Sequence, residues 1–314
     1  MGGARRFVDE LDAYLAEKER SVTVLGRDAR LTLAHLVGRE RHADQSGCRI
    51  AANNVSFARG HTKKVLLRNA LHFLSDAERR SLGSAVASRR LRSEAMLVRA
   101  MASRADRIIV PSLSMADRVS AKCPALASRM EVKPHPVSLA PKLPREVLGP
   151  PSILLPVLYA EFKHLDKTLP VVAAAIDRIE ADSHPGLSFQ VTLSADEATL
   201  CGIGQFRTVV ALGRLSTEQV SKEWDRSSVI VYPTSIESFG YPLAEANLRR
   251  LPVLARGDDW VREIAEDALV PLDLGSSATV EQSIRTALEY QPPVRGVSIF
   301  NRVNYFDRLF EPGR

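Results

Sequence analysis

Two carboxylates stand at either end of a short turn in the second half of the chain. Glu237 and Glu245 enclose the stretch ESFGYPLAE, in which Ser238, Phe239 and Gly240 follow the first acid. A carboxylate accepts hydrogen bonds from hydroxyl groups, so two acids so placed could bracket one ligand that carries hydroxyls at both ends. On spacing alone, an exposed loop acid and a helix-surface acid are the simpler interpretation. The surrounding elements therefore decide between a ligand site and two unrelated surface acids.

A strand and a helix are predicted on the two sides of this turn. The apolar run Ser228–Tyr232 (SVIVY) predicts a buried strand. Pro242 fits the first turn of a helix, where its missing N–H costs nothing, so a helix should begin near Gly240. The unpaired N–H groups and positive dipole end of such a helix suit a diphosphate, and a residue without Cβ lets phosphate approach the backbone.

The two acids then take different parts of one ligand. Glu245 lies a little over one turn inside the predicted helix, and helical side chains lean toward the N-terminus. Its carboxylate can therefore reach a ribose diol beside the phosphate. Glu237, on the loop before the turn, would face a sugar on the far side of the diphosphate. This pattern predicts a site for a nucleotide sugar.

The context of the acidic motif resembles glycosyltransferase family 4 of the GT-B superfamily, and the resemblance covers nearly the whole chain. It implies two Rossmann-like, doubly wound parallel-sheet domains of the α/β class that face a cleft. The residues that carry it are ESFGYPLAEA (237–246), LPVLARG (251–257), VREIAEDALVPLD (261–273) and, upstream, VVALGRLSTEQVSKEWDRSSVIVYPTS (209–235).

The resemblance also implies an activity. A hexose would move with retention from a nucleoside-diphosphate sugar to a saccharide or lipid-linked acceptor, in cell-surface polysaccharide or glycolipid synthesis. The donor is a substrate, and no cofactor is expected. Glu237 is expected to act in catalysis, while the donor is expected to contact Glu245 and the turn residues Ser238, Phe239, Gly240 and Tyr241.

A lysine follows the predicted first strand of the second half. Lys163 matches the family lysine that neutralises the donor diphosphate, and a fixed cation there stabilises the charge that develops on the leaving group. Family members often carry an arginine five residues earlier, where this chain has Leu158. Lys167 could substitute, although a solvated lysine in a first helical turn is the simpler interpretation.

The N-terminus departs from the family pattern. Met1-Gly2-Gly3 matches the family's glycine-rich loop, so Gly3 is expected at the donor, but the short strand that should precede the loop is absent. A central strand pairs on both edges, and its loss would leave backbone groups unpaired. A start assigned too late, a chain trimmed at its N-terminus and a shorter natural variant are the three interpretations.

Further candidates lie in the first half of the chain. Arg68, Asn69 and His72 follow a predicted strand, and the resemblance implies that Asn69 and His72 contact the donor sugar or the acceptor. A packed, hydrogen-bonded histidine is an equal alternative for His72. Ser112 and Ser114 resemble a loop serine of the family, but a helix N-cap is the favoured interpretation.

Length and composition suit two globular domains. The chain has 314 residues, of which 45% are hydrophobic and 25% charged. No apolar run approaches the roughly 18 residues of a membrane span, and the N-terminus lacks a signal-peptide core. Cys48, Cys123 and Cys201 have no metal-ligand spacing. These features predict a cytoplasmic protein, with peripheral association at the inner face of the membrane left open.

Strands alternate with helices along the chain, which favours parallel sheets. Prolines gather after residue 133, which divides the sequence into an acceptor-side domain (1–135), a linker (136–151), a donor-binding domain (152–295) and a C-terminal helix (296–314) that packs back on the first domain. Predicted strands cover 22–25, 49–52, 64–67, 107–110, 131–133, 153–158, 188–193, 208–212 and 228–232, and predicted helices cover 4–19, 76–104, 165–179 and 217–225.

The positive charge of the chain has three interpretations. The formal net charge is +6, and many arginines fall in and around one predicted helix. A solvated helix face comes first, a contact with anionic lipid second, and nucleic acid last because no binding motif accompanies the charge. The arginines are Arg79, Arg80, Arg89, Arg90, Arg92, Arg99 and Arg104.

Two other classes of function stay open. A sugar-nucleotide epimerase of GT-B fold would bind the same kind of ligand, and a non-catalytic subunit of a polysaccharide-assembly complex would keep the fold without turnover. The chain contains no Asp-x-Asp triplet, so no metal site is predicted and metal-independent transfer is expected. The sugar and the acceptor depend on a few pocket contacts that one sequence does not identify.

Overall fold

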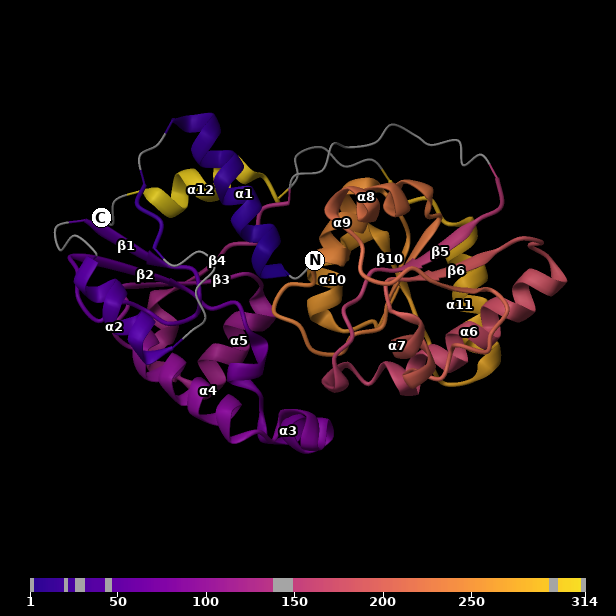
Figure 1. Ribbon diagram of the computed structural model, residues 1–314, viewed down its shortest axis with the longest axis horizontal. Coiled ribbons are helices and arrows are strands. Elements are labelled where there is room, and N and C mark those ends of the chain that lie inside the picture. Colours follow the sequence, from indigo (N-terminus) through magenta and orange to yellow (C-terminus); the bar gives the residue numbers. More distant parts are fainter. Residues whose placement is uncertain are drawn as a thin grey trace. The chain divides into compact units, whose positions relative to one another are not determined.

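The protein forms two α/β units, each built on its own parallel sheet (Figure 1). The computed structural model describes residues 3–19, 22–25, 32–42, 47–137, 149–293 and 299–311. Unit 1 contains Met1–Arg6 and Val137–Ser298, and unit 2 contains Phe7–Pro136 and Ile299–Arg314. The boundary between the units therefore falls inside the first helix, α1 (Gly3–Lys18).

Unit 2 has a four-stranded sheet in the order β1-β2-β3-β4, with every neighbouring pair parallel. Among the described residues each strand is hydrogen-bonded directly to the next one in this order, so the sheet has no gap where a further strand would fit between them. The strand predicted at 22–25 is wrong: Val22 and Val24 are 38% and 43% exposed and lie outside any strand. An apolar alternation without a pairing partner does not form a strand. The strands are Cys48–Ala51, Thr62–Leu66, Arg107–Val110 and Met130–Val132.

The long helix predicted at 76–104 is also wrong, because the chain contains three shorter elements there. Ser75 begins the first with a capping box, and Gly83 ends it with φ 55°, a left-handed value that glycine tolerates. Ser88 then caps a new helix by accepting a hydrogen bond from the Leu91 N–H. The three elements are α3 (Asp76–Leu82), η2 (Gly83–Val86) and α4 (Arg89–Ala102).

The last helix, α12 (Arg302–Phe310), packs within unit 2 although it comes from the far end of the chain. Its aromatic face lies in an apolar cluster with Phe7 and Tyr14 of α1, and the Tyr14 hydroxyl donates to Asp307 at 2.6 Å. The buried Lys64 of β2 donates from Nζ to the Leu309 and Glu311 carbonyl oxygens at 2.8 and 2.7 Å. Lys64 thus caps the C-terminal end of α12. The remaining helices of unit 2 are α2 (Leu33–His42), η1 (Ala70–Phe73), α5 (Leu113–Lys122) and η3 (Pro124–Arg129).

Unit 1 has a six-stranded parallel sheet in the order β10-β9-β8-β5-β6-β7. The chain builds β5, β6 and β7 outward in one direction and then returns to place β8 against the other edge of β5. This is a doubly wound sheet whose strand order reverses between β5 and β8. The strands are Ser152–Leu155, Ser188–Val191, Val209–Ala211, Val229–Tyr232, Val253–Ala255 and Leu269–Pro271, in chain order from β5 to β10.

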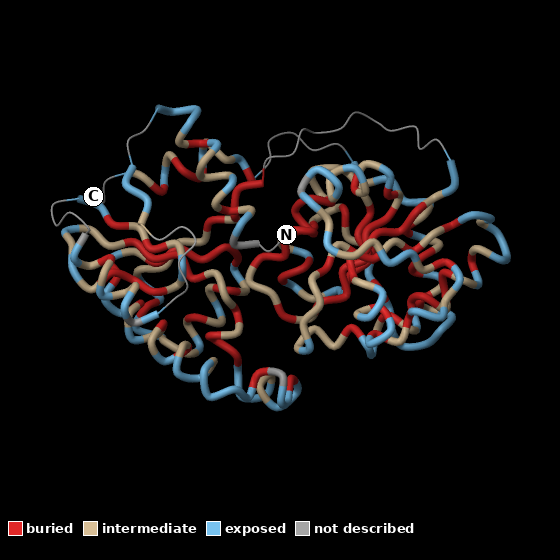
Figure 2. The backbone as a smooth tube through the Cα atoms, viewed as in Figure 1, coloured by how far each residue is buried: buried red, intermediate tan, exposed pale blue. Residues whose placement is uncertain are grey.

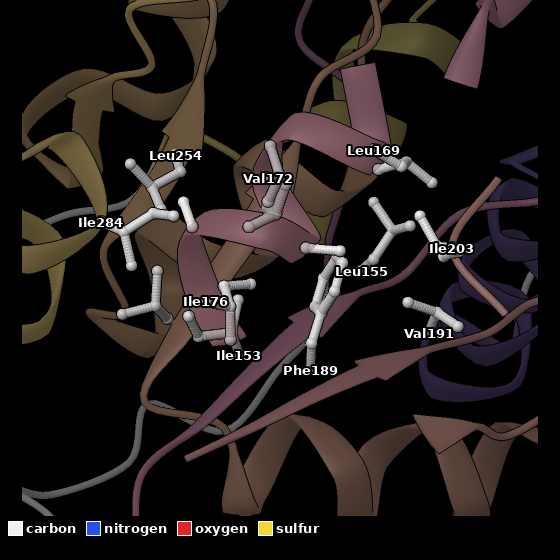
Figure 3. Close-up of a cluster of buried hydrophobic side chains, with 14 of the residues drawn as sticks. Ile153, Leu155, Leu169, Val172, Ile176, Phe189, Val191, Ile203, Leu254 and Ile284 are labelled. Carbon is white, nitrogen blue, oxygen red and sulfur yellow. The ribbon is translucent and has the colours of Figure 1, made fainter. Parts of the chain in front are cut away.

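The core of unit 1 lies where its central strands meet helices α6 and α11. Figure 3 shows side chains of β5, β6 and α6 gathered in one apolar cluster with Leu254 and Ile284. The central strands are buried along their length (Figure 2), as expected for a parallel sheet covered on both faces. The helices are η4 (Glu161–Lys163), α6 (Leu165–Asp182), α7 (Ala195–Leu200), α8 (Thr217–Arg226), α9 (Tyr241–Arg249), α10 (Asp259–Ala265), η5 (Glu266–Ala268) and α11 (Ser277–Glu289).

Candidate nucleotide-sugar site

The helix predicted to begin near Gly240 is confirmed as α9, with Gly240 as its N-cap and Pro242 in its first turn. Gly240 has φ 75° and ψ 67°, in the left-handed region. A Cβ at this position would lie 3.0 Å from Cζ3 of Trp260 and 3.1 Å from Cδ1 of Leu243. Backbone conformation and packing thus both favour glycine where the helix presents its N–H groups.

Lys163 and Glu237 reach each other across the reversal of strand order. Lys163 follows β5 and Glu237 follows β8, and these strands pair side by side. The Lys163 Nζ lies 3.3 Å from Oε1 of Glu237. In open α/β sheets, ligands bind beyond the carboxyl ends of the strands at such a reversal. The structure therefore brings together the two side chains that the sequence predicted as catalytic.

Tyr232 is a further member of the site that the sequence prediction treated only as the end of a strand. It is 3% exposed, and its hydroxyl donates to Oε1 of Glu237 at 3.0 Å. Burial, followed by the neighbouring Glu237 carboxylate, raises the pKa of the Tyr232 hydroxyl well above its ordinary value. Tyr232 thus remains a phenol and a hydrogen-bond donor. Together with Lys163 it fixes the orientation of Glu237.

Glu245 is a buried carboxylate with a cationic partner. It is 7% exposed, and Oε1 accepts a hydrogen bond from Nη1 of Arg6. Oε2 is also buried and has no hydrogen-bond partner among the described residues. Burial raises the pKa of Glu245, while the Arg6 charge acts in the opposite direction. One oxygen of this side chain is therefore held in place, and the other is a buried acceptor that no described residue satisfies.

Arg6 lies at the first turn of α9. Its guanidinium carbon is 5.8 Å from the centroid of the Tyr241 ring, and Tyr241 is the first residue of that helix. The Tyr241 ring packs edge-on against the buried Phe239, with the ring centroids 5.1 Å apart. Ser238 precedes Phe239 on the same loop. The sequence prediction missed Arg6, and only its adjacency to the glycine-rich start of the chain could have suggested it.

The other predicted ligand contacts have internal roles in the structure. Gly3 is the first residue of α1. In unit 2, Asn69 caps η1 by accepting a hydrogen bond from the Leu71 N–H. His72 is buried, with Nε2 3.3 Å from the Asn69 amide nitrogen and 3.6 Å from Glu94 Oε1. Donor or acceptor contacts by these three residues remain predictions.

Ser112 confirms the helix-cap interpretation, because its Oγ accepts a hydrogen bond from the Met115 N–H at the start of α5. Ser114 lies inside α5. Ser112 therefore helps to begin a helix, which accounts for its place after β3.

Two acid–cation pairs thus flank one helix N-terminus in unit 1. Glu237 pairs with Lys163 before the helix, and Glu245 pairs with Arg6 inside it. The carboxylates can accept hydroxyl hydrogen bonds, while the cations and the helix N–H groups favour an anion between them. This combination matches a ligand with a central diphosphate and a sugar at each end.

Solved structures with a similar arrangement of elements include a glycosyltransferase. WaaG, a glycosyltransferase involved in lipopolysaccharide biosynthesis, aligns with a TM-score of 0.62 at 14% identity, over 98% of this chain and 92% of its own. TarM aligns with a TM-score of 0.58 at 12% identity, over 81% of this chain and 50% of its own. The chain therefore has the GT-B fold, and it spans only half the length of TarM.

An epimerase shares this arrangement too. A putative UDP-N-acetylglucosamine 2-epimerase from Listeria monocytogenes aligns with a TM-score of 0.50 at 11% identity, over 98% of this chain and 79% of its own. No family model matches the sequence, and no curated protein matches it. At these identities the similarity establishes the fold, while the chemistry must be argued from the site.

Proposed function

We propose that this chain is a glycosyltransferase of the family 4 type that moves a hexose from a nucleoside-diphosphate sugar to a saccharide or lipid-linked acceptor. The observation that carries the proposal is the pair of acid–cation contacts on either side of the α9 N-terminus, at the reversal of strand order in unit 1. A GT-B fold alone would also suit an epimerase. The separate carboxylate for the hexose, held by Tyr232 and Lys163, favours transfer.

Each residue has a defined part in the proposed reaction. Glu245 accepts the ribose hydroxyls, and the N–H groups of α9 beyond Gly240 bind the diphosphate. Lys163 stabilises the charge that develops on the leaving diphosphate as the glycosidic bond breaks. Glu237 orients the hexose. The leaving phosphate oxygen accepts the proton of the acceptor hydroxyl, which attacks from the same face and gives retention without a metal ion.

The test is acceptor-dependent release of the nucleotide. Purified protein is screened by thermal shift and saturation-transfer NMR against a panel of UDP-, GDP- and ADP-sugars, and the bound donor is then incubated with and without candidate acceptors. Nucleoside diphosphate released only with acceptor, together with a glycosylated product, supports transfer. Epimerised sugar formed without acceptor would instead establish an epimerase, and binding without turnover under every condition would favour a non-catalytic subunit.

The proposed acceptor class extends to lipid-linked saccharides at the inner face of the membrane. No helix within the described part of the chain is long and apolar enough to cross a bilayer. On α4, however, Arg89, Arg90 and Arg92 are exposed, and Met96 is 63% exposed. Arginines beside an exposed apolar side chain suit a surface contact with anionic lipid. Co-sedimentation with phosphatidylglycerol vesicles, absent with phosphatidylcholine vesicles and abolished by alanine at the three arginines, is the expected result.

A further inference from the structure

Arg6 stands out because it comes from the N-terminal end of the sequence and yet lies at the predicted phosphate-binding end of α9. Two contacts place it there: Nη1 donates to Oε1 of Glu245, and the guanidinium lies 5.8 Å from the centroid of the Tyr241 ring. These partners are the first and fifth residues of α9. Arg6 therefore lies along the first turn of this helix, where the backbone N–H groups have no intrahelical partners.

The chemistry of this arrangement suits a phosphate. A guanidinium carries five N–H donors in a planar fork, and phosphate oxygens accept from two of them at once. The contact with Glu245 uses Nη1. The Arg6 side chain keeps 18% of its surface exposed, so it is accessible from solvent. Glu245 also holds a second buried oxygen, Oε2, with no partner among the described residues.

The same pattern recurs at the other acid of the motif. Glu237 holds Lys163, and Glu245 holds Arg6, so each carboxylate fixes one cation beside the helix N-terminus. A cation whose orientation is already fixed loses less conformational entropy when it binds a ligand. The two acids would then have a double role, because each accepts ligand hydroxyls and also positions a cation.

We propose that Arg6 is a donor-binding residue whose guanidinium contacts the diphosphate while Glu245 holds it in place. This inference rests on the proposed function and adds to it a second phosphate-binding cation beside Lys163. It also assigns to Glu245 the positioning of Arg6 in addition to the ribose contact. The start of α1 thus supplies a charged group to the nucleotide site of unit 1.

A rival role for the same contact predicts the opposite result. If Arg6 merely occupied the carboxylate of Glu245, a ribose diol would have to displace it, and removal of Arg6 would strengthen nucleotide binding. If Arg6 acted only by keeping Glu245 ionised, its removal would weaken nucleoside and nucleoside diphosphate alike. If Arg6 contacts the phosphates, its removal weakens binding of the nucleoside diphosphate more than binding of the nucleoside.

The experiment measures Kd by isothermal titration calorimetry for a nucleoside diphosphate and for its parent nucleoside. The base is chosen as the one that the unsubstituted protein binds most tightly among UDP, GDP and ADP. The variants are Arg6→Ala and Arg6→Lys. The lysine keeps a positive charge beside the buried Glu245 and so guards against loss of the fold. Arg5→Ala is the matched control, because Arg5 is the exposed neighbour on the same helix. Melting temperatures confirm that each variant is folded.

Arg6→Ala is expected to weaken diphosphate binding about 10- to 150-fold, as for a lost hydrogen bond to a charged group, while nucleoside binding weakens by a clearly smaller factor, because Arg6 also pairs with Glu245. The diphosphate affinity of Arg6→Lys should lie between those of the parent and Arg6→Ala, and Arg5→Ala should bind both ligands as the parent does. Unchanged or tighter diphosphate binding in Arg6→Ala, or an equal loss for nucleoside and diphosphate, would overturn the inference alone. A parent protein that binds none of the three diphosphates would overturn the proposed function and, with it, this inference.

Discussion

The proposed ribose contact of Glu245 gives the sharpest quantitative test of the site. In Glu245→Gln the side chain keeps its shape but loses its charge, and in Glu245→Ala it is removed. Oε2 is buried and without a partner among the described residues, so a ribose hydroxyl would donate to a desolvated carboxylate. Hydrogen bonds to a charged group contribute about 1.5–3 kcal/mol. Since about 1.4 kcal/mol is tenfold in affinity, we expect nucleotide binding to weaken roughly 10- to 150-fold.

The assay compares ribose and dideoxyribose nucleotides, which isolates the diol from the other contacts. Isothermal titration calorimetry with UDP and with 2′,3′-dideoxy-UDP, or the corresponding pair for the preferred base, gives four affinities for the parent and Glu245→Ala. The ratio of the parent's affinities for the ribonucleotide and the dideoxyribonucleotide should about equal the factor by which Glu245→Ala weakens binding of the ribonucleotide. The variant should bind both nucleotides equally, because it has no carboxylate for the diol.

Two results would refute this reasoning. The first is equal affinity of the parent for the two nucleotides, which would show that no carboxylate accepts the diol. The second is a ribonucleotide preference that survives in Glu245→Ala, which would assign the diol to another residue. Thermal denaturation serves as the control, because Glu245 is also the partner of Arg6.

Other expectations concern the hexose side of the site, metal ions and pH. Glu237→Gln should lower kcat and leave the affinity for the bare nucleotide unchanged; transfer at the parental rate would remove its role. Tyr232→Phe should lower kcat about tenfold, because Glu237 loses a hydrogen bond that orients it; an unchanged kcat would count against that role. Transfer should continue in excess EDTA, whereas a complete loss restored by magnesium would contradict metal independence. Burial lowers the pKa of His72, and it lowers the pKa of the buried His135, which lies just after β4, well below its ordinary value. Below about pH 6.5 the unfolded chain therefore binds protons that these folded imidazoles do not, and stability should fall by up to about 1.4 kcal/mol per pH unit for each group. Thermal denaturation at pH 7.5 and 5.5 measures this loss, and His135→Gln should reduce it.

Much of unit 1 could be predicted because its signals are local. Buried parallel strands are continuous apolar runs, and Gly240 and Pro242 mark the start of α9 in the sequence. The residues that divide the predicted helix 76–104, Gly83 and Ser88, are local signals as well, and the prediction did not use them. The apolar run at 22–25 failed for another reason, because strand formation needs a neighbour that a single segment does not reveal.

The partners of the acids could not be predicted in this way. Arg6 and Glu245 are separated by 239 positions in the chain, and nothing in either segment specifies the other. Lys163 was predicted by resemblance, yet its contact with Glu237 depends on the pairing of β5 with β8. In the sequence Tyr232 is the last residue of an apolar strand, and only the structure shows that its hydroxyl lies 3.0 Å from Oε1 of Glu237. Long-range pairing is a property of the sheet order, which local patterns do not encode.

The charge balance of the ligand-free site follows from the cost of burial. A carboxylate as buried as Glu245 is destabilised in its ionised form unless a cation compensates it, and Arg6 supplies that compensation. Lys163 pairs in turn with Glu237, at 3.3 Å. With both pairs internally neutral, the attraction for a dianionic diphosphate must come from the α9 N-terminus and from N–H donors that the cations still have available. In the proposed reaction, this arrangement leaves carboxylate oxygens for the sugar hydroxyls and places both cations beside the position where the leaving group would gain charge.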